Sequence, residues 1–333
     1  MDCAPVFVVG CPRSGTTLLR LMRDSHPSLA IPDESHFVVE LHGHTGWLAA
    51  RRSPAHTLER VLDHVRFARW GLDPAVVRQM AAITAPSSYA EVMRTVFAAY
   101  AAANGKRRWG DKSSPYLAHI PLLAELFPGA QFIHIIRDGR EVAASLASQR
   151  WGPPTPIAAA SLWKARVRNG ISAGRQRPSG QYLEVRLEDL IAQPERVLRG
   201  VCEFLHEPFA QDMLEYHRTG QQRVWSGHPH DPEYVDHGHV SLPPTAGLRD
   251  WRTESSAAEQ RALEAAAQPL LGELGYAADR PALRAVLRVE ADSLRRLPGT
   301  LKRKTLSRTR GLRFELAAQY GQARSRRLSG SRR

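Results

Sequence analysis

Cysteine is scarce in this chain, and long apolar runs are absent. The three cysteines, Cys3, Cys11 and Cys202, have neither the spacing of a metal-ligand set nor that of a disulfide framework. We therefore expect reduced thiols and a cytoplasmic protein, because disulfides are rare in that compartment. No apolar stretch approaches the ~20 residues that a membrane-spanning helix needs. No signal peptide is predicted either, since Asp2 directly precedes an expected strand.

Acidic residues are almost absent from the carboxyl-terminal end. Between Lys302 and Arg333 there are eleven Lys and Arg residues but one acid, Glu315, so this segment contributes +10 of the net charge of +13. The rest of the chain is close to neutral, and its charge does not indicate a nucleic-acid partner. We predict one domain at residues 1–298 and a basic tail at residues 299–333 that contacts anionic surfaces only weakly.

The most informative stretch begins with an apolar run at residues 6–9. Gly10 ends this run, and a helical pattern of apolar residues starts near Thr16, so a buried strand, a short turn and a helix should follow one another directly. This geometry points backbone N–H groups and a helix N-terminus at one place, which suits an anion. The alternative is a tight turn in which the glycines are incidental.

This loop is similar to a Walker A loop but lacks its lysine. Gly10, Gly15 and Thr17 have the Walker spacing, whereas Thr16 stands at the lysine position and a cation appears earlier, at Arg13. Because that lysine reaches the β- and γ-phosphates of a nucleoside triphosphate, its absence argues against ATP or GTP hydrolysis. A P-loop kinase or NTPase is kept as the alternative enzyme class.

The same stretch, Pro-Arg-Ser-Gly-Thr-Thr, resembles the 5′-phosphosulfate loop of sulfotransferases that use 3′-phosphoadenosine 5′-phosphosulfate (PAPS). The branch it resembles contains tyrosylprotein, carbohydrate and many bacterial sulfotransferases. The resemblance implies sulfuryl transfer from PAPS, with adenosine 3′,5′-bisphosphate as product and no metal requirement. In this loop it assigns donor binding to Pro12, Arg13, Ser14, Gly15, Thr16 and Thr17.

A second stretch, residues 130–145, resembles the 3′-phosphate site of the same family. An apolar strand is predicted to end at Arg137, and a helix that contains Ser145 follows. In the resembled family an Arg and a Ser at these positions clamp the 3′-phosphate, and a guanidinium and a hydroxyl are suitable donors. Relatives often carry another Arg four residues after the Ser, where this chain has Gln149. The alternative is an ordinary strand–turn–helix.

An acidic pair, Asp33 and Glu34, follows a short predicted strand that Pro32 ends. In the resembled family an acidic pair at this distance from the loop supplies the general base, and Glu34 takes that position. Such a group is needed because the acceptor hydroxyl must lose its proton as it attacks sulfur. The alternative is that the two acids cap a following helix.

Residues 108–116 resemble the Trp-Gly-Glu-Lys-Thr-Pro segment of the family. Lys112 should end a short strand and reach the same sheet edge as the loop. There, with Arg13, it would stabilise charge on the sulfuryl group and the leaving phosphate. Without the neighbouring motifs it would read as a solvated lysine.

Three segments flank these motifs. Residues 41–105 show helical spacing and are predicted to form an inserted layer that walls the acceptor pocket. The His-rich stretch 228–239 is interpreted as a loop over the acceptor site, with a metal site as the weaker alternative. Arg249 precedes the last expected helix and is predicted to approach the nucleotide.

The sequence therefore predicts a P-loop-like three-layer α/β fold, with a parallel sheet of about four or five strands flanked by helices. The predicted function is sulfuryl transfer from PAPS to a hydroxyl or amine of a small-molecule, carbohydrate or glycosylated acceptor. A basic nucleic-acid- or membrane-binding protein that uses the loop as scaffold is the alternative outside enzymes, and only the tail favours it. The acceptor and the oligomeric state are left open.

Overall fold

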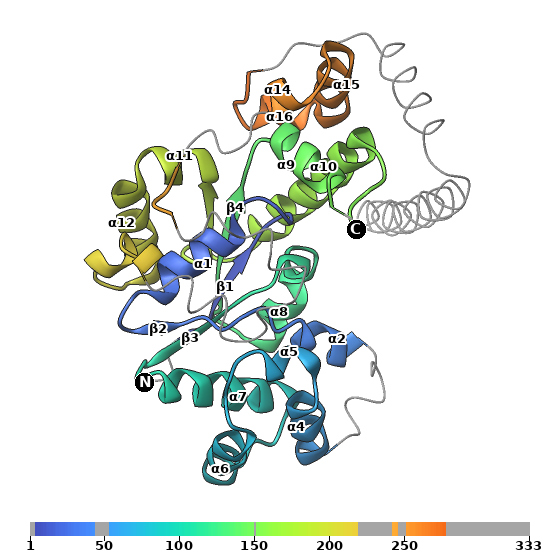
Figure 1. Cartoon of the computed structure of the whole chain (residues 1–333). Helices are drawn as coiled ribbons and strands as arrows, with labels where there is room; N and C mark the ends of the chain where they lie inside the picture. Colours follow the sequence, from blue (N-terminus) through green and yellow to red (C-terminus); the bar gives the residue numbers. More distant parts are fainter. Residues whose placement is uncertain (1–3, 44–52, 150, 219–241, 246–250, 278–333) are drawn as a thin grey trace, which may run out of the picture. The chain divides into compact units, whose positions relative to one another are not determined.

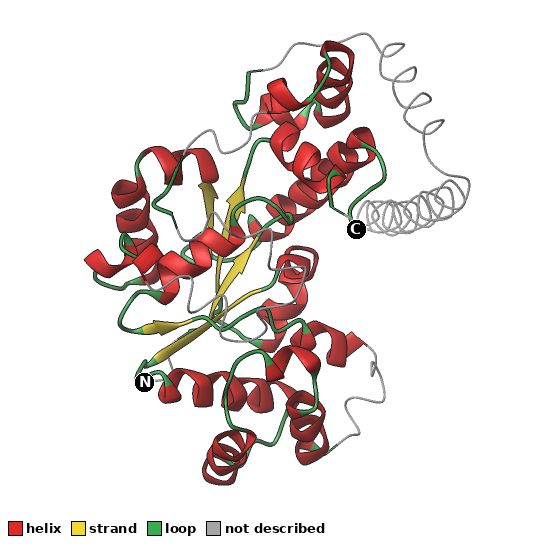
Figure 2. Ribbon diagram, in the orientation of Figure 1, coloured by secondary structure: helices red, strands yellow, loops and turns green. Residues whose placement is uncertain are grey.

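The computed structural model describes residues 4–43, 53–149, 151–218, 242–245 and 251–277. Its centre is a five-stranded parallel sheet with the order β2-β3-β1-β4-β5 (Figures 1 and 2). The predicted α/β fold with a parallel sheet is thereby confirmed. The strands are β1 (Val6–Val9), β2 (Leu29–Ala30), β3 (Arg108–Lys112), β4 (Gln131–Ile136) and β5 (Tyr182–Arg186).

Helices occupy most of the remaining described chain. The helices are α1 (Thr16–Asp24), α2 (Phe37–Gly43), α4 (Pro54–Leu62), α5 (Val65–Ala68), α6 (Pro74–Thr84), α7 (Tyr89–Ala103), α8 (Ile120–Leu126), α9 (Gly139–Ala147), α10 (Pro156–Gly174), α11 (Leu187–Ala192), α12 (Pro194–Leu205), α14 (Trp251–Glu254), α15 (Ala257–Ala267) and α16 (Leu270–Glu273), with 3₁₀ helices η1 (Ser114–His119) and η2 (Gln211–Met213). None of the described helices combines the length and the apolar character needed to cross a membrane.

The two faces of the sheet belong to two separate apolar clusters. Side chains alternate along a strand, so Phe7 and Val9 of β1 join one cluster while Val6 and Val8 join the other. The first cluster contains apolar residues of α2 and α4 to α8, and the second contains those of α1, α11 and α12 (Figure 1). The central strand β1 is therefore a continuous apolar run (Val-Phe-Val-Val), as expected for a parallel strand covered on both faces.

The described residues between β2 and β3 are mostly helical, and the segment expected to form one helix is divided. The pattern at residues 57–70 predicts one helix, whereas the structure ends α4 at Leu62 and starts α5 at Val65. His64 separates them because its ring nitrogen accepts the N–H of Arg66 and caps α5 (3.1 Å). Trp109 of β3 stacks on Phe97 of α7, which ties this helical layer to the sheet.

The described chain forms two compact units. One contains the sheet and comprises the residues up to Asp138 together with those from Trp163 to 245; the other comprises residues 139–162 and 251–277. In the second unit, Arg140 of α9 donates to a Glu264 oxygen of α15 (2.7 Å) and lies over the Trp251 ring. The apolar spacing at residues 256–274 predicts one helix, whereas the structure has α15 and α16, because Pro269 lacks the N–H that a continuous helix requires. The predicted boundary between a domain and a tail near residue 298 lies outside the described residues.

Gly10 allows β1 to lie close to β4, which gives a stability prediction. A Cβ at Gly10 would lie 2.7 Å from the Ile135 carbonyl oxygen and 2.9 Å from Thr16 Cγ2. We expect Gly10→Ala to lower the free energy of unfolding by roughly 1–3 kcal/mol, the usual cost of overpacking. Gly200→Ala is the matched control, because a Cβ there meets nothing within 4 Å inside α12. It should stabilise by about 0.5–1 kcal/mol through helix propensity. Urea unfolding of both variants measures the difference, and equal effects of the two would contradict this packing argument.

Candidate active site

The loop between β1 and α1 has the geometry of an anion-binding turn. Arg13 and Gly15 both take left-handed backbone conformations (φ 72° and 87°), and the Ser14 N–H bonds back to the Cys11 carbonyl (3.1 Å). The helix then starts at Thr16, and its first turn leaves backbone N–H groups without intrahelical acceptors. Such N–H groups together with the positive end of the helix dipole favour an anion at this point.

The loop is closely packed at Gly15 and contains a buried hydroxyl at Ser14. A Cβ at Gly15 would approach Leu187 Cδ1 to 2.6 Å, so the turn packs directly against the residue that follows β5. The Ser14 side chain is fully buried, and its Oγ has no hydrogen-bond partner among the described residues. A buried hydroxyl without a partner is destabilising by about 1–3 kcal/mol, and an anionic oxygen would satisfy it.

Arg137 lies beside this loop, as its position after β4 predicts. Its Nη1 donates to the Arg13 carbonyl oxygen (3.1 Å), so the side chain lies against the turn rather than in open solvent. Three strand ends therefore converge here, because β1 lies between β3 and β4 in the sheet. The predicted loop residues Pro12 to Thr17 and Arg137 form one neighbourhood at the carboxyl edge of the sheet.

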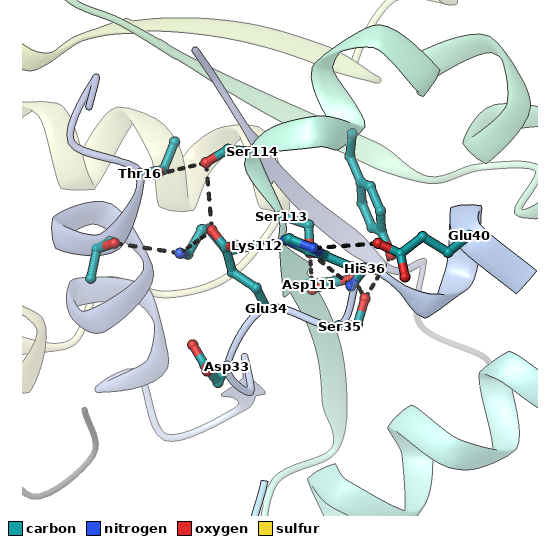
Figure 3. Close-up of polar contacts among 12 residues, drawn as sticks. Thr16, Asp33, Glu34, Ser35, His36, Glu40, Asp111, Lys112, Ser113 and Ser114 are labelled. Carbon is teal, nitrogen blue, oxygen red and sulfur yellow. Dashed lines mark hydrogen bonds and ion pairs between the residues drawn. The ribbon is translucent and has the colours of Figure 1, made fainter. Parts of the chain in front are cut away.

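Glu34 and Lys112 form the centre of the site (Figure 3). Lys112 Nζ lies 2.7 Å from Glu34 Oε1, and the two side chains are only 5% and 19% exposed. Lys112 Nζ also donates to Thr17 Oγ1 in the first turn of α1 (3.4 Å), while Ser114 Oγ lies 3.5 Å from both Glu34 Oε1 and Thr16 Oγ1. The structure thus brings the predicted base, the predicted lysine and the loop together.

The ion pair determines the protonation of Glu34. Burial opposes the charged form, but the Lys112 ammonium and the His36 ring together hold the pKa of Glu34 far below its ordinary value. In this arrangement Glu34 is a carboxylate whose Oε1 accepts from Lys112 and whose Oε2 accepts from His36 (2.7 Å). A carboxylate can take a proton, but with these partners it is a weak base.

Asp33 does not share this environment. Its backbone carbonyl accepts the Trp70 indole N–H (2.9 Å), which ties the chain before Glu34 to the helical layer. In Figure 3 its carboxylate lies apart from the Glu34–Lys112 pair. The geometry therefore separates the two acids.

A buried network beside Glu34 was not predicted from the sequence. Ser35 Oγ donates to Asp111 Oδ2 (2.5 Å) and contacts Tyr116 Oη (2.6 Å), while Ser113 Oγ donates to Asp111 Oδ1 (3.3 Å). Burial raises the pKa of Asp111 to about 6, and the Glu34 charge acts in the same direction while the two serine hydroxyls lower it. The sequence indicated this network only through the match of Asp111 to an acidic position of the family segment. That match does not identify the serines or the tyrosine as partners of Asp111. The network attaches the Glu34 segment to the end of β3.

The remaining predicted residues are placed differently. Ser145 is buried in α9 and belongs to the second unit, so its pairing with Arg137 stays a prediction. Gln149, at the position where relatives often have Arg, donates to the Ser145 carbonyl (3.3 Å). Arg249 and the His-rich stretch 228–239 lie outside the described residues. Within the described ranges, no group of three or more His, Cys, Asp or Glu side chains is arranged to hold a metal ion.

The raised pKa of Asp111 predicts a specific pH dependence of stability. The native state keeps the Asp111 proton up to about pH 6, whereas the unfolded chain releases it near 3.8. This contribution to stability is fully present below the unfolded value and is lost as the pH rises through the folded value. Asp111→Asn cannot ionise, so its stability relative to wild type should increase by about 2 to 3 kcal/mol between pH 4 and pH 7. Urea unfolding across this range tests it, with Asp212→Asn on the exposed η2 as control. A wild-type-like pH profile for Asp111→Asn would contradict the assignment.

The chain matches known proteins over the part that contains this site. A family model described as "Sulfotransferase family" matches residues 5–211. The nodulation protein NoeE of Sinorhizobium fredii is 29% identical over 308 residues, which cover 81% of this chain and 65% of NoeE. Protein-tyrosine sulfotransferase A of Caenorhabditis elegans is 26% identical over 224 residues, which cover 63% of this chain and 52% of that protein. The chain thus spans about half to two thirds of the length of these two relatives.

A solved structure agrees with these sequence matches. The sulfotransferase domain of the Synechococcus PCC 7002 olefin synthase is 25% identical, with a TM-score of 0.59, and the match covers 84% of this chain and 98% of that domain. The family model spans the β1–α1 loop, the Glu34–Lys112 pair and Arg137, and it matches more than half of the chain. The chain belongs to the sulfotransferase family.

Proposed function

We propose that this sulfotransferase moves a sulfuryl group from PAPS to a hydroxyl, or an amine, of a small-molecule, carbohydrate or glycosylated acceptor. The observation that carries the proposal is the contact of Glu34 with Lys112 at the first turn of α1. It joins a carboxylate, an ammonium and a set of backbone N–H groups at one sheet edge. These are the groups that proton removal and charge stabilisation during sulfuryl transfer require.

The donor is supported by the chemistry of the loop. The first-turn N–H groups of α1, the buried Ser14 hydroxyl and the nearby Arg13 and Arg137 side chains suit an anion with several oxygens. The Walker lysine is missing, which disfavours a nucleoside triphosphate held through its γ-phosphate. In our proposal Arg13, Lys112 and the loop N–H groups stabilise the transferring SO₃ and the leaving 5′-phosphate oxygen, while Arg137 and Ser145 bind the 3′-phosphate.

The ion pair implies a dependence of the base on the donor. While Lys112 contacts Glu34 Oε1, the carboxylate is a poor proton acceptor because its pKa is held low. The sulfate and phosphate oxygens of the donor are competing partners for the Lys112 ammonium. As Lys112 moves toward them, Oε1 becomes available to the acceptor and the pKa of Glu34 rises. A base with a pKa closer to the working pH is more effective.

The acceptor is assigned only to a chemical class. A relative is named a protein-tyrosine sulfotransferase, which supports a hydroxyl acceptor. The segment proposed to wall the acceptor pocket, residues 41–105, includes α4 to α7, whose buried apolar side chains pack on one face of the sheet. We propose a cytoplasmic enzyme on the sequence argument alone.

The activity has a direct test. Purified protein incubated with ³⁵S-labelled PAPS and a panel of hydroxylated acceptors should transfer label in the presence of a chelator. Activity that depends strictly on Mg²⁺ would contradict the proposed mechanism. Titration calorimetry separates the rival class: adenosine 3′,5′-bisphosphate should bind and ATP–Mg should bind poorly, whereas tight ATP–Mg binding would favour a P-loop kinase or NTPase.

The role of Glu34 is tested by two carboxyl-to-amide changes. Glu34→Gln should lower kcat by a factor on the order of 10² to 10⁴, the usual loss for a general base. Affinity for adenosine 3′,5′-bisphosphate should change little, because the amide has the same size and the proposed nucleotide contacts lie elsewhere. Asp33→Asn is the matched control and should have a much smaller effect. Normal turnover by Glu34→Gln with loss of activity in Asp33→Asn would move the base by one residue.

A further inference from the structure

His36 contacts the proposed base and is not part of the roles assigned above. Its Nε2 lies 2.7 Å from Glu34 Oε2, and its Nδ1 lies 3.6 Å from Glu40 Oε1 on α2. Glu40 Oε2 in turn lies 3.1 Å from His64 Nε2 (Figure 3 shows His36 between the two glutamates). The His36 side chain is only 15% exposed, whereas Glu40 is 49% exposed. The imidazole therefore links the buried carboxylate to the surface of α2.

The two oxygens of Glu34 have different partners, and only one of these partners is expected to move. Oε1 accepts from Lys112, which also reaches Thr17 of α1 and for which the donor oxygens compete. Oε2 accepts from His36. Because Glu34 is ionised, Nε2 of His36 must carry the hydrogen in this contact. Once Lys112 shifts toward the donor, the His36 bond is the remaining strong contact that fixes the direction of the carboxylate.

The backbone holds His36 rigidly enough for this task. His36 takes a left-handed conformation (φ 52°), and its carbonyl accepts the N–H groups of Val39 and Glu40 at the start of α2 (3.2 and 3.1 Å). The preceding Ser35 is bonded to the buried Asp111 and Tyr116. Left-handed backbone is uncommon for residues other than glycine, and it is found where the surrounding structure holds it in place.

We propose that His36 is the positioning residue for Glu34: its Nε2–H holds Oε2, so that Oε1 faces the acceptor when Lys112 contacts the donor. This inference rests on the proposed role of Glu34 as base. His36 takes no proton from the acceptor itself. The charged and titratable groups around the imidazole are Glu34 and Lys112 on the site side, Glu40 and His64 on the surface side, and Asp111 from β3. Carboxylates therefore stand on both sides of the ring, Glu34 at Nε2 and Glu40 at Nδ1.

Two amide variants that differ by one methylene test the proposal. The Gln amide of His36→Gln can reach the position of Nε2 and donate to Glu34, whereas the shorter Asn amide of His36→Asn reaches only the position of Nδ1. Asn tolerates left-handed backbone better than Gln, so the thermal stability of His36→Asn should equal or exceed that of His36→Gln. Activity should follow the opposite order.

We expect His36→Asn to lower kcat by about 10- to 100-fold, the loss that a small misplacement of a catalytic group produces. The KM for PAPS should stay within about twofold, because His36 makes no contact with the loop. His36→Gln should retain kcat within about threefold, since it keeps the donated hydrogen bond. His56→Asn, on an exposed turn of α4, is the control for loss of an imidazole and should behave as wild type.

The pH profile separates positioning from a general structural role. The hydrogen bond and charge of His36 lower the pKa of Glu34, so its loss in His36→Asn should move the acid limb of kcat/KM to higher pH. His36→Gln should leave that limb nearer to the wild-type position. In a Glu34→Gln background, His36→Asn should lower kcat by less than about twofold more, because a residue that acts through Glu34 has nothing left to position.

Each outcome decides one point. Equal losses in His36→Asn and His36→Gln, activities that follow thermal stability, or a full additional loss in the Glu34→Gln background would overturn the proposal for His36. Normal turnover by Glu34→Gln itself would instead overturn the assignment of Glu34 as the base. Because that result comes from a different variant, the two failures are distinguishable. Wild-type kcat in His36→Asn, with Glu34→Gln inactive, would leave the base in place and remove His36 from the mechanism.

Discussion

The parallel pairing of β1 with both β3 and β4 is the constraint on which this site depends. In that register Lys112, the last residue of β3, pairs with Val8, whereas β4 continues two residues beyond His134, the partner of Val9. The strand pairing therefore brings three features to one edge of the sheet: the β1–α1 loop, Lys112 and Arg137. The absence of a Cβ at Gly10 permits the close approach of β1 and β4 on which this edge relies.

The ion pair of Lys112 and Glu34 adds an electrostatic constraint to that frame. Two charges in a largely buried place are tolerated because each neutralises the other, and an isolated buried charge would be strongly unfavourable. The same pairing keeps the carboxylate weakly basic. In the proposed mechanism, this pairing couples the basicity of Glu34 to the binding of a competing anion by Lys112.

Much of this arrangement was predictable from local sequence. The strand–loop–helix at residues 6–24 follows from an apolar run, two glycines and a helical pattern. Lys112 and Arg137 lie near the β1–α1 loop because Lys112 is the last residue of β3 and Arg137 directly follows β4. The contacts of Ser35 with Asp111 and Tyr116 join residues 76 and 81 positions apart, and they depend on how β2 and β3 pack rather than on any local pattern. The role of Asp111 as a partner of the serines, and the position of His36 between Glu34 and Glu40, could not be predicted for the same reason.

The division of the sheet into two apolar faces has a consequence for how such an enzyme diversifies. The helices α2 and α4 to α8 share a cluster with Phe7 and Val9, whereas α1, α11 and α12 share one with Val6 and Val8. Alternate residues of the same strand therefore pack against different sets of helices. Substitutions that reshape the helical layer between β2 and β3 are compensated within one cluster and leave the packing behind the β1–α1 loop unchanged. One face of the sheet can therefore be repacked while the buried contacts of the other face keep their geometry.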